Sequence, residues 1–114
     1  MSHPQVRLTS QQIAGIVDGV AEFVQGGDAE LRLHGSRVDL DRKGGDIDLL
    51  LITPSDRMRD TLMQRKHHLL SAIKKNIGDQ KIDLTIASQT QIETDPFLQI
   101  IFPTSVLLHC FSRD

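Results

Sequence analysis

With 114 residues, of which 39% are hydrophobic and 25% charged, the chain has the size and composition of one globular domain over residues 1–114. It can bury a core without disulfides, and its single cysteine, Cys110, cannot form one internally. The net charge of −2 demands no polyanionic partner, although 7 of the 13 Lys and Arg lie between Arg57 and Lys81 and weakly suggest phosphate binding.

Membrane and secretory signals are not expected in this chain. No apolar run approaches the roughly 18 residues of a membrane-spanning helix, and the first ten residues lack the pattern of a secretory signal. Tryptophan and tyrosine, the usual platforms for stacking single-stranded nucleic acid, do not occur. We therefore expect a cytoplasmic protein without a membrane contact, and the short chain makes a nucleic-acid template unlikely as a partner.

The first predicted element is an amphipathic helix that begins after Thr9 and runs up to Gly26 and Gly27. Thr9 and Gln12, three positions apart, form a capping-box pattern. Apolar residues then recur at helical spacing, namely Ile13, Ile16, Val17, Val20 and Val24.

Three strands are predicted where the apolar period changes to two, over residues 29–35, 46–53 and 81–87. A polar, glycine-rich loop over residues 37–45 separates the first two. One face of these strands supplies the expected core, which is Leu31, Leu33, Ile47, Leu49, Leu51, Ile82, Leu84 and Ile86.

A long helix is predicted between the second and third strands. Thr53 precedes Pro54, which suits the first helical position, and Gly78 supplies a stop signal. Its apolar stripe is Met58, Leu62, Leu69, Leu70, Ile73 and Ile77. In the C-terminal segment we expect a short helix over about 95–102 and an edge strand over about 106–109. The fold class is then α/β (α+β): a small mixed sheet with helices packed on one face.

Asp46 and Asp48 open the second strand, and they require an explanation that a core strand does not supply. Residues i and i+2 of a strand share a face, so the two carboxylates lie side by side while Ile47 packs inward. Asp83 has the same parity in the third strand. If the strands are neighbours, three like charges converge, and a hard cation such as Mg²⁺ or Mn²⁺ would neutralise them. A pair of such ions is an apparatus for phosphoryl and nucleotidyl transfer.

The step from Gly35 to Ser36 fits the same chemistry. A glycine at a strand end lets the backbone approach a ligand closely, and the amide and hydroxyl of Ser36 can donate to phosphate oxygens. Arg37 could add a charge-assisted contact.

The stretch "HGSRVDLDRKGGDIDLLLI" resembles the signature of the DNA polymerase beta nucleotidyltransferase superfamily, and "KIDLTIA" resembles the strand of its third carboxylate. The chain length resembles that of the minimal nucleotidyltransferases, often antitoxin partners of HEPN-domain toxins. The resemblance implies a polymerase-beta-like fold, in which Gly35 and Ser36 hold the triphosphate and Asp46 and Asp48 bind both metal ions. Asp83 would bind the catalytic metal and help to activate the attacking hydroxyl.

The resulting hypothesis is a Mg²⁺-dependent transfer of a nucleoside monophosphate, most simply AMP from ATP, to a hydroxyl acceptor. The acceptor would belong to a small molecule or to another protein chain, such as a HEPN-type toxin or a second copy. A binding module that neutralises such a toxin by contact alone is the alternative. Leu50 and Ile52 share the face of the aspartates, so either the chain's own C-terminal segment or a partner must cover them.

Simpler interpretations remain for several residues. The aspartates could be solvated residues at a strand end after a turn. His67 and His68 point about 100° apart on a helix and are expected to be solvated rather than metal ligands. His34 precedes Gly35 on the carboxylate face, where a structural hydrogen bond is the simpler role, and Cys110 is expected to be a packing or surface thiol.

Overall fold

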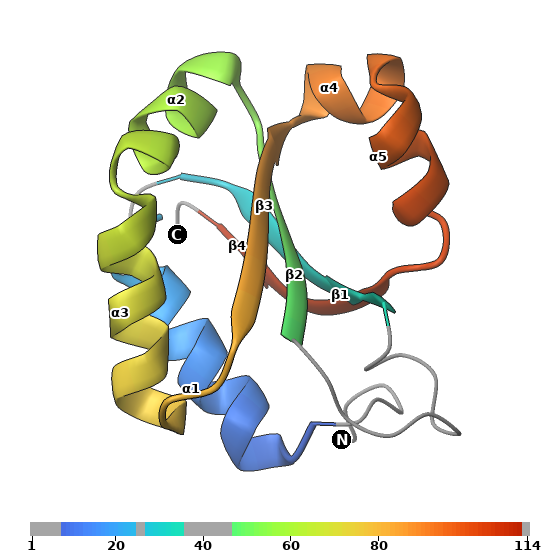
Figure 1. The fold of residues 1–114 in the computed structure, drawn as a ribbon. Coiled ribbons are helices and arrows are strands. Elements are labelled where there is room, and N and C mark those ends of the chain that lie inside the picture. The colour runs from blue at the N-terminus through green and yellow to red at the C-terminus, as the bar shows by residue number, and fades with distance from the viewer. Residues whose placement is uncertain (1–7, 25–26, 36–46, 113–114) are drawn as a thin grey trace.

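The computed structural model describes residues 8–24, 27–35 and 47–112. One mixed sheet contains β1 (Ala29–His34), β2 (Ile47–Thr53), β3 (Ile82–Ser88) and β4 (Val106–Phe111) in the order β3-β2-β1-β4 (Figure 1). β2 and β3 are parallel, whereas β1 pairs antiparallel with β2 and with β4. The predicted class, a small mixed sheet combined with helices, is confirmed.

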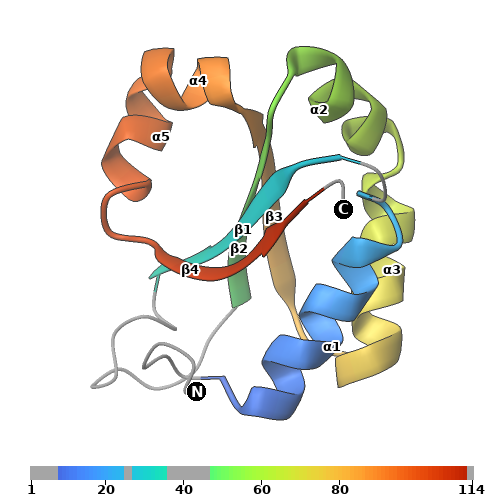
Figure 2. The same cartoon turned by 180° about the vertical axis from the view of Figure 1, so that it is seen from behind.

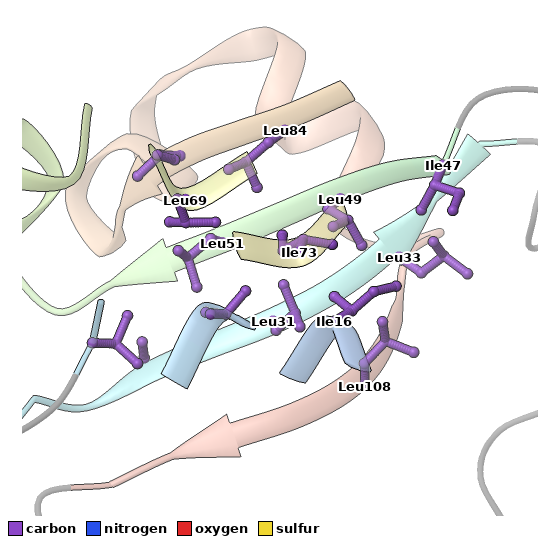
Figure 3. Packing of buried hydrophobic residues seen from close by; sticks show 14 of the residues in the cluster. Ile16, Leu31, Leu33, Ile47, Leu49, Leu51, Leu69, Ile73, Leu84 and Leu108 are labelled. Carbon is purple, nitrogen blue, oxygen red and sulfur yellow. The ribbon is translucent and has the colours of Figure 1, made fainter. Parts of the chain in front are cut away.

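Three helices cover one face of the sheet, which we call the core face: α1 (Ser10–Ala21), α2 (Asp56–Gln64) and α3 (Lys66–Ile77) (Figure 1, Figure 2). All eight expected core residues of the sheet belong to this cluster or pack against it, as do the apolar stripes of the helices (Figure 3). The predicted capping box of Thr9 and Gln12 is present, but α1 ends at Ala21, earlier than expected.

Glycines on α1 allow it to approach α3 closely. A Cβ atom at Gly19 would lie 3.0 Å from backbone atoms of Ile73, and one at Gly15 would lie 2.6 Å from the Ile77 side chain. The side-chain amide of Asn76 donates to the Gly15 carbonyl at 2.9 Å. The two helices therefore form a tightly fitted layer over the core face.

The prediction of a single long helix after β2 is wrong in two respects. Thr53 stays in β2, and Ser55 is the N-cap of α2, accepting a hydrogen bond from the Met58 amide. The helix is also broken at Arg65, whose φ of −110° and ψ of 16° are not helical. The apolar stripe is interrupted at Arg65 and Lys66, so its two halves pack on the core as two separate helices. The Arg65 guanidinium lies over the Phe23 ring.

The second face of the sheet is covered in part by two short helices, α4 (Gln89–Thr94) and α5 (Pro96–Ile101) (Figure 2). Leu50 and Ile52 are fully buried here, in a small cluster with Ala87 and Leu98. The chain's own C-terminal segment thus covers them, and no partner is needed for that purpose. The expectation of helices on one face holds for α1 to α3 only.

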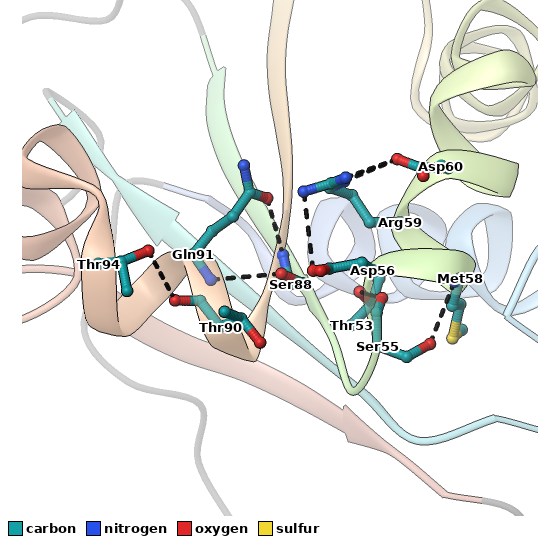
Figure 4. A network of polar contacts seen from close by, with 10 residues as sticks. All are labelled: Thr53, Ser55, Asp56, Met58, Arg59, Asp60, Ser88, Thr90, Gln91 and Thr94. Atoms are coloured by element: carbon teal, nitrogen blue, oxygen red, sulfur yellow. Dashed lines mark hydrogen bonds and ion pairs between the residues drawn. The ribbon is translucent and has the colours of Figure 1, made fainter.

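Helix α4 was not predicted from the sequence, although its sequence contains a signal for a helix start. Ser88 is its N-cap, and Ser88 and Gln91 form a second capping box (Figure 4). At the neighbouring end of β2, the buried Thr53 hydroxyl donates to the Ser55 carbonyl at 2.8 Å. The carboxyl ends of the two parallel strands are therefore closed by local hydrogen bonds.

Arg32 contacts the segment between α5 and β4 and stabilises its position on the second face of the sheet. Its guanidinium lies 4.5 Å from the centre of the Phe102 ring and donates to the hydroxyl of Ser105 at 2.6 Å and to its carbonyl at 3.3 Å. It also pairs with the half-buried Glu30. One side chain of β1 thereby holds the connection that positions α5.

We predict that Arg32→Met lowers the free energy of unfolding by about 1–3 kcal/mol, because it leaves half-buried polar groups without their partner. Arg59→Met is the matched control: Asp56 and Asp60, the partners of Arg59, are exposed, and ion pairs with exposed partners contribute about 0–1 kcal/mol. Urea unfolding of the three proteins measures both values. Equal losses in the two variants would contradict the anchoring role of Arg32.

Candidate functional site

Asp48 and Asp83 stand directly opposite each other at the amino ends of β2 and β3. The parallel register pairs them, and between neighbouring strands such positions are about 4.8 Å apart. Ile47 and Leu84, with the opposite parity, point into the core. Asp83 is exposed and Asp48 is partly buried. The predicted convergence of these two carboxylates on one face is confirmed.

Gly35, at the end of β1, lies close to the carboxylate of Asp48. It follows β1 with a φ of 79°, a conformation that favours glycine. A Cβ atom at this position would lie 2.3 Å from Oδ2 of Asp48, so a larger residue does not fit without moving that side chain. We predicted that Gly35 lets the backbone approach a ligand closely. The structure places this backbone close to the carboxylate of Asp48.

His34 completes a row across three strands. It is the antiparallel register partner of Asp48, so the order along the row is His34, Asp48 and Asp83. β1 alternates between buried and partly buried residues, with Leu31 and Leu33 in the core and His34 on the second face. Within the described residues, His34 Nε2 is the one buried side-chain nitrogen or oxygen atom without a hydrogen-bond partner.

Three of the predicted site residues, Ser36, Arg37 and Asp46, lie outside the residues that the structure describes. Asp46, the first of the three predicted metal-binding carboxylates, is among them. Within the described ranges, no group of three or more His, Cys, Asp or Glu side chains is arranged to hold a metal ion. Of the predicted triad, the structure places Asp48 and Asp83 opposite each other. The position of Asp46 stays a prediction.

The donor set at this edge fits a hard divalent cation. Mg²⁺ is usually held by one or two carboxylates and completes its shell with water and substrate phosphates. Asp48 and Asp83 supply carboxylate oxygens from adjacent strands, and the exposure of Asp83 leaves the row open to a ligand. Phosphate recognition and metal-assisted transfer are the chemistry that such an edge can support.

The other residues considered as ligands do not form a comparable group. The rings of His67 and His68 lie 4.0 Å apart on the exposed side of α3, far along the chain from the carboxylate row. Cys110 is exposed on β4, as expected for a surface thiol. Among the described helices, none is long and apolar enough to cross a membrane.

Comparisons with known proteins add no family to this description, since no family model and no curated protein matches the chain.

We predict that Gly35→Ala destabilises the protein more than Gly78→Ala does. Both residues have positive φ, and a Cβ atom there costs about 1–2 kcal/mol. Nothing lies within 4 Å of a Cβ atom at Gly78, whereas Asp48 obstructs one at Gly35. We expect an additional loss of about 1–3 kcal/mol at Gly35, as for other overpacked sites, measured by urea unfolding.

A double-mutant cycle tests the cause of that difference. With Asp48→Ala in the background, the cost of Gly35→Ala should fall to that of Gly78→Ala, because the obstructing carboxylate is gone. If the difference persists without the Asp48 side chain, the contact between Gly35 and Asp48 is not its source.

Proposed function

We propose that this chain is a Mg²⁺-dependent nucleotidyltransferase of the DNA polymerase beta type, moving AMP from ATP to a hydroxyl group. The observation that carries the proposal is the pairing of Asp48 with Asp83 on adjacent parallel strands, beside the backbone of Gly35. Two carboxylates in this position are poorly explained by packing, because burying the core requires neither of them. The pattern Gly35-Ser36 and Asp46-x-Asp48 in the sequence supports the same chemistry.

In this proposal each acidic residue has its own role. Asp46 and Asp48 bind the cation, with Asp83 as the third ligand, and Gly35, Ser36 and Arg37 contact the triphosphate. Bound Mg²⁺ or Mn²⁺ would neutralise the phosphate oxygens and stabilise the charge that develops during transfer. The absence of a side chain at Gly35 leaves room for the Asp48 carboxylate beside the backbone.

The transfer itself exchanges one P–O bond for another. The oxygen of the acceptor hydroxyl attacks the α-phosphorus, and the bond from that phosphorus to the bridging oxygen of the β-phosphate breaks. Pyrophosphate leaves with the electron pair of that bond. Asp83, exposed at the edge strand, accepts the proton of the attacking hydroxyl.

We predict that Asp83→Asn retains ATP affinity within about threefold and loses turnover by about 10²–10⁴, the usual contribution of a general base. Asp48→Asn should weaken both, because this residue serves the cation and the nucleotide. Asp79→Asn, an exposed change close to β3, is the control. Calorimetry with Mg-ATP gives the affinity, and mass spectrometry of AMP added to the acceptor gives turnover. Metal-independent binding that is equal in all variants would contradict the assignment.

We place the acceptor hydroxyl on a cytoplasmic protein partner, either a HEPN-type toxin or a second copy of this chain. Large apolar side chains that the fold leaves exposed support a partner surface: Phe97 and Ile100 on α5 and Leu107 on β4. In the described sheet, β4 is an edge strand paired only with β1, and such edges often accept another chain. The same surface supports the alternative function, a non-catalytic antitoxin that neutralises a HEPN-type protein by contact.

We predict that Ile100→Glu and Leu107→Glu weaken association with the protein encoded by the neighbouring gene, or self-association, at least tenfold. Met63→Glu on α2 is the matched control, since Met63 is 47% exposed but lies on a different helix from Ile100, which is 71% exposed. Light scattering of the chain alone and mixed with its neighbour measures both events. A strictly monomeric wild type that ignores its neighbour would instead favour a small-molecule acceptor.

The two functions are separated by one further comparison. If Asp83→Asn neutralises the partner as well as the wild type does, and no AMP is found on that partner, the chain acts by contact. Loss of neutralisation in Asp83→Asn with retained binding supports transfer.

A further inference from the structure

Over residues 8–24, 27–35 and 47–112, the buried polar side chains have hydrogen-bond partners with one exception. The buried hydroxyls of Thr53, Ser88 and Ser105 all take part in hydrogen bonds to nearby groups. Among the described residues, only His34 Nε2 is buried without a partner. An unpaired buried polar atom costs stability, so its presence needs a reason other than folding.

The position of His34 supplies a reason. It is in register with Asp48, one strand away from Asp83, and it directly precedes Gly35, whose backbone touches the Asp48 carboxylate. The one unpaired atom and the paired carboxylates therefore occupy the same row of the sheet. His34 as a residue is only partly buried, so part of it is accessible to solvent.

The chemistry of the row indicates what this nitrogen can bind. Ionised Asp48 and Asp83 offer only acceptor atoms, whereas an imidazole N–H is a donor. A phosphate group placed over this row needs donors as well as a cation, because its own oxygens are acceptors. A hydrogen bond between an N–H group and a phosphate oxygen is charge-assisted and stronger than a neutral one.

We propose that His34 is a ligand-positioning residue, whose Nε2–H donates a hydrogen bond to a phosphate oxygen of the bound nucleoside triphosphate. This inference rests on the proposed function and adds a contact that the sequence motif does not assign. Because Nε2 is buried, the ring has to rotate about its Cβ–Cγ bond for this nitrogen to reach a ligand. The ligand then satisfies an atom that the folded chain leaves without a partner.

The test compares His34→Leu with His34→Gln, because glutamine places a polar atom at about the distance of Nε2 and leucine does not. For Mg-ATP and for Mg-tripolyphosphate, we expect binding about tenfold weaker in His34→Leu, the size of one hydrogen bond to a charged group, and most of it regained in His34→Gln. Using both ligands separates a phosphate contact from a base contact. His67→Leu, an exposed change on α3, is the control.

The melting temperature of the ligand-free proteins separates the proposed role from a purely structural one, because loss of a structural histidine would lower it. We expect His34→Leu to melt at the wild-type temperature or above it, because it removes an unpaired buried atom. A lower melting temperature combined with unchanged affinity would show a structural role and overturn the proposal. The proposal would also be overturned if His34→Leu weakened the binding of Mg-ATP but not of Mg-tripolyphosphate, because the contact would then be to the base or sugar.

The failure of this inference differs from a failure of the proposed function. If the wild type binds neither Mg-ATP nor Mg-tripolyphosphate, the proposed function itself is wrong. If the wild type binds both and His34→Leu binds them equally well, only the role of His34 is wrong.

Discussion

The parallel register between β2 and β3 is the constraint on which the rest of the structure depends. Because side chains alternate along a strand, this register buries Ile47, Leu49 and Leu84 and at the same time sets Asp48 against Asp83. Burying each large aliphatic side chain is worth about 1.5–3 kcal/mol, whereas two carboxylates 4 Å apart repel by about 1 kcal/mol in water. The core therefore enforces the juxtaposition of the two acids, and a slip by one residue would turn Asp83 inward.

The same register divides the sheet into regions with different uses. The core face is fully occupied by α1, α2 and α3, and α4 and α5 cover the part of the second face that contains Leu50 and Ile52. The row of His34, Asp48 and Asp83 precedes Leu50 along β2 and stays outside that apolar cluster. Arg32, two residues before His34 in β1, contacts the segment that follows α5. The covering helices thus determine which part of the second face a ligand can reach.

The sequence predicted those features that are determined locally. Alternation identified β1, β2 and β3, and the capping pattern of Thr9 identified the start of α1. The break at Arg65 was missed because its cause is tertiary: the two halves of the stripe reach the core separately, and Arg65 packs on Phe23, which lies in the turn after α1. Likewise, alternation shows that Asp48 and Asp83 each face away from the core, but only strand order and register make them neighbours. The unpaired nitrogen of His34 could not be predicted, since burial of a single atom depends on the whole fold.

The two ends of the parallel strands differ in how completely they satisfy their polar groups. At the carboxyl ends, the hydroxyls of Thr53 and Ser88 each form a hydrogen bond within the turns that start α2 and α4. At the amino ends, a pair of like charges and the unpaired His34 nitrogen occupy one row. Natural sequences are locally consistent nearly everywhere, and departures from consistency concentrate where a protein binds something. The row that joins two neighbouring carboxylates to an unpaired nitrogen is therefore the part of the sheet where the proposed ligand, which carries both a cation and anionic oxygens, would bind.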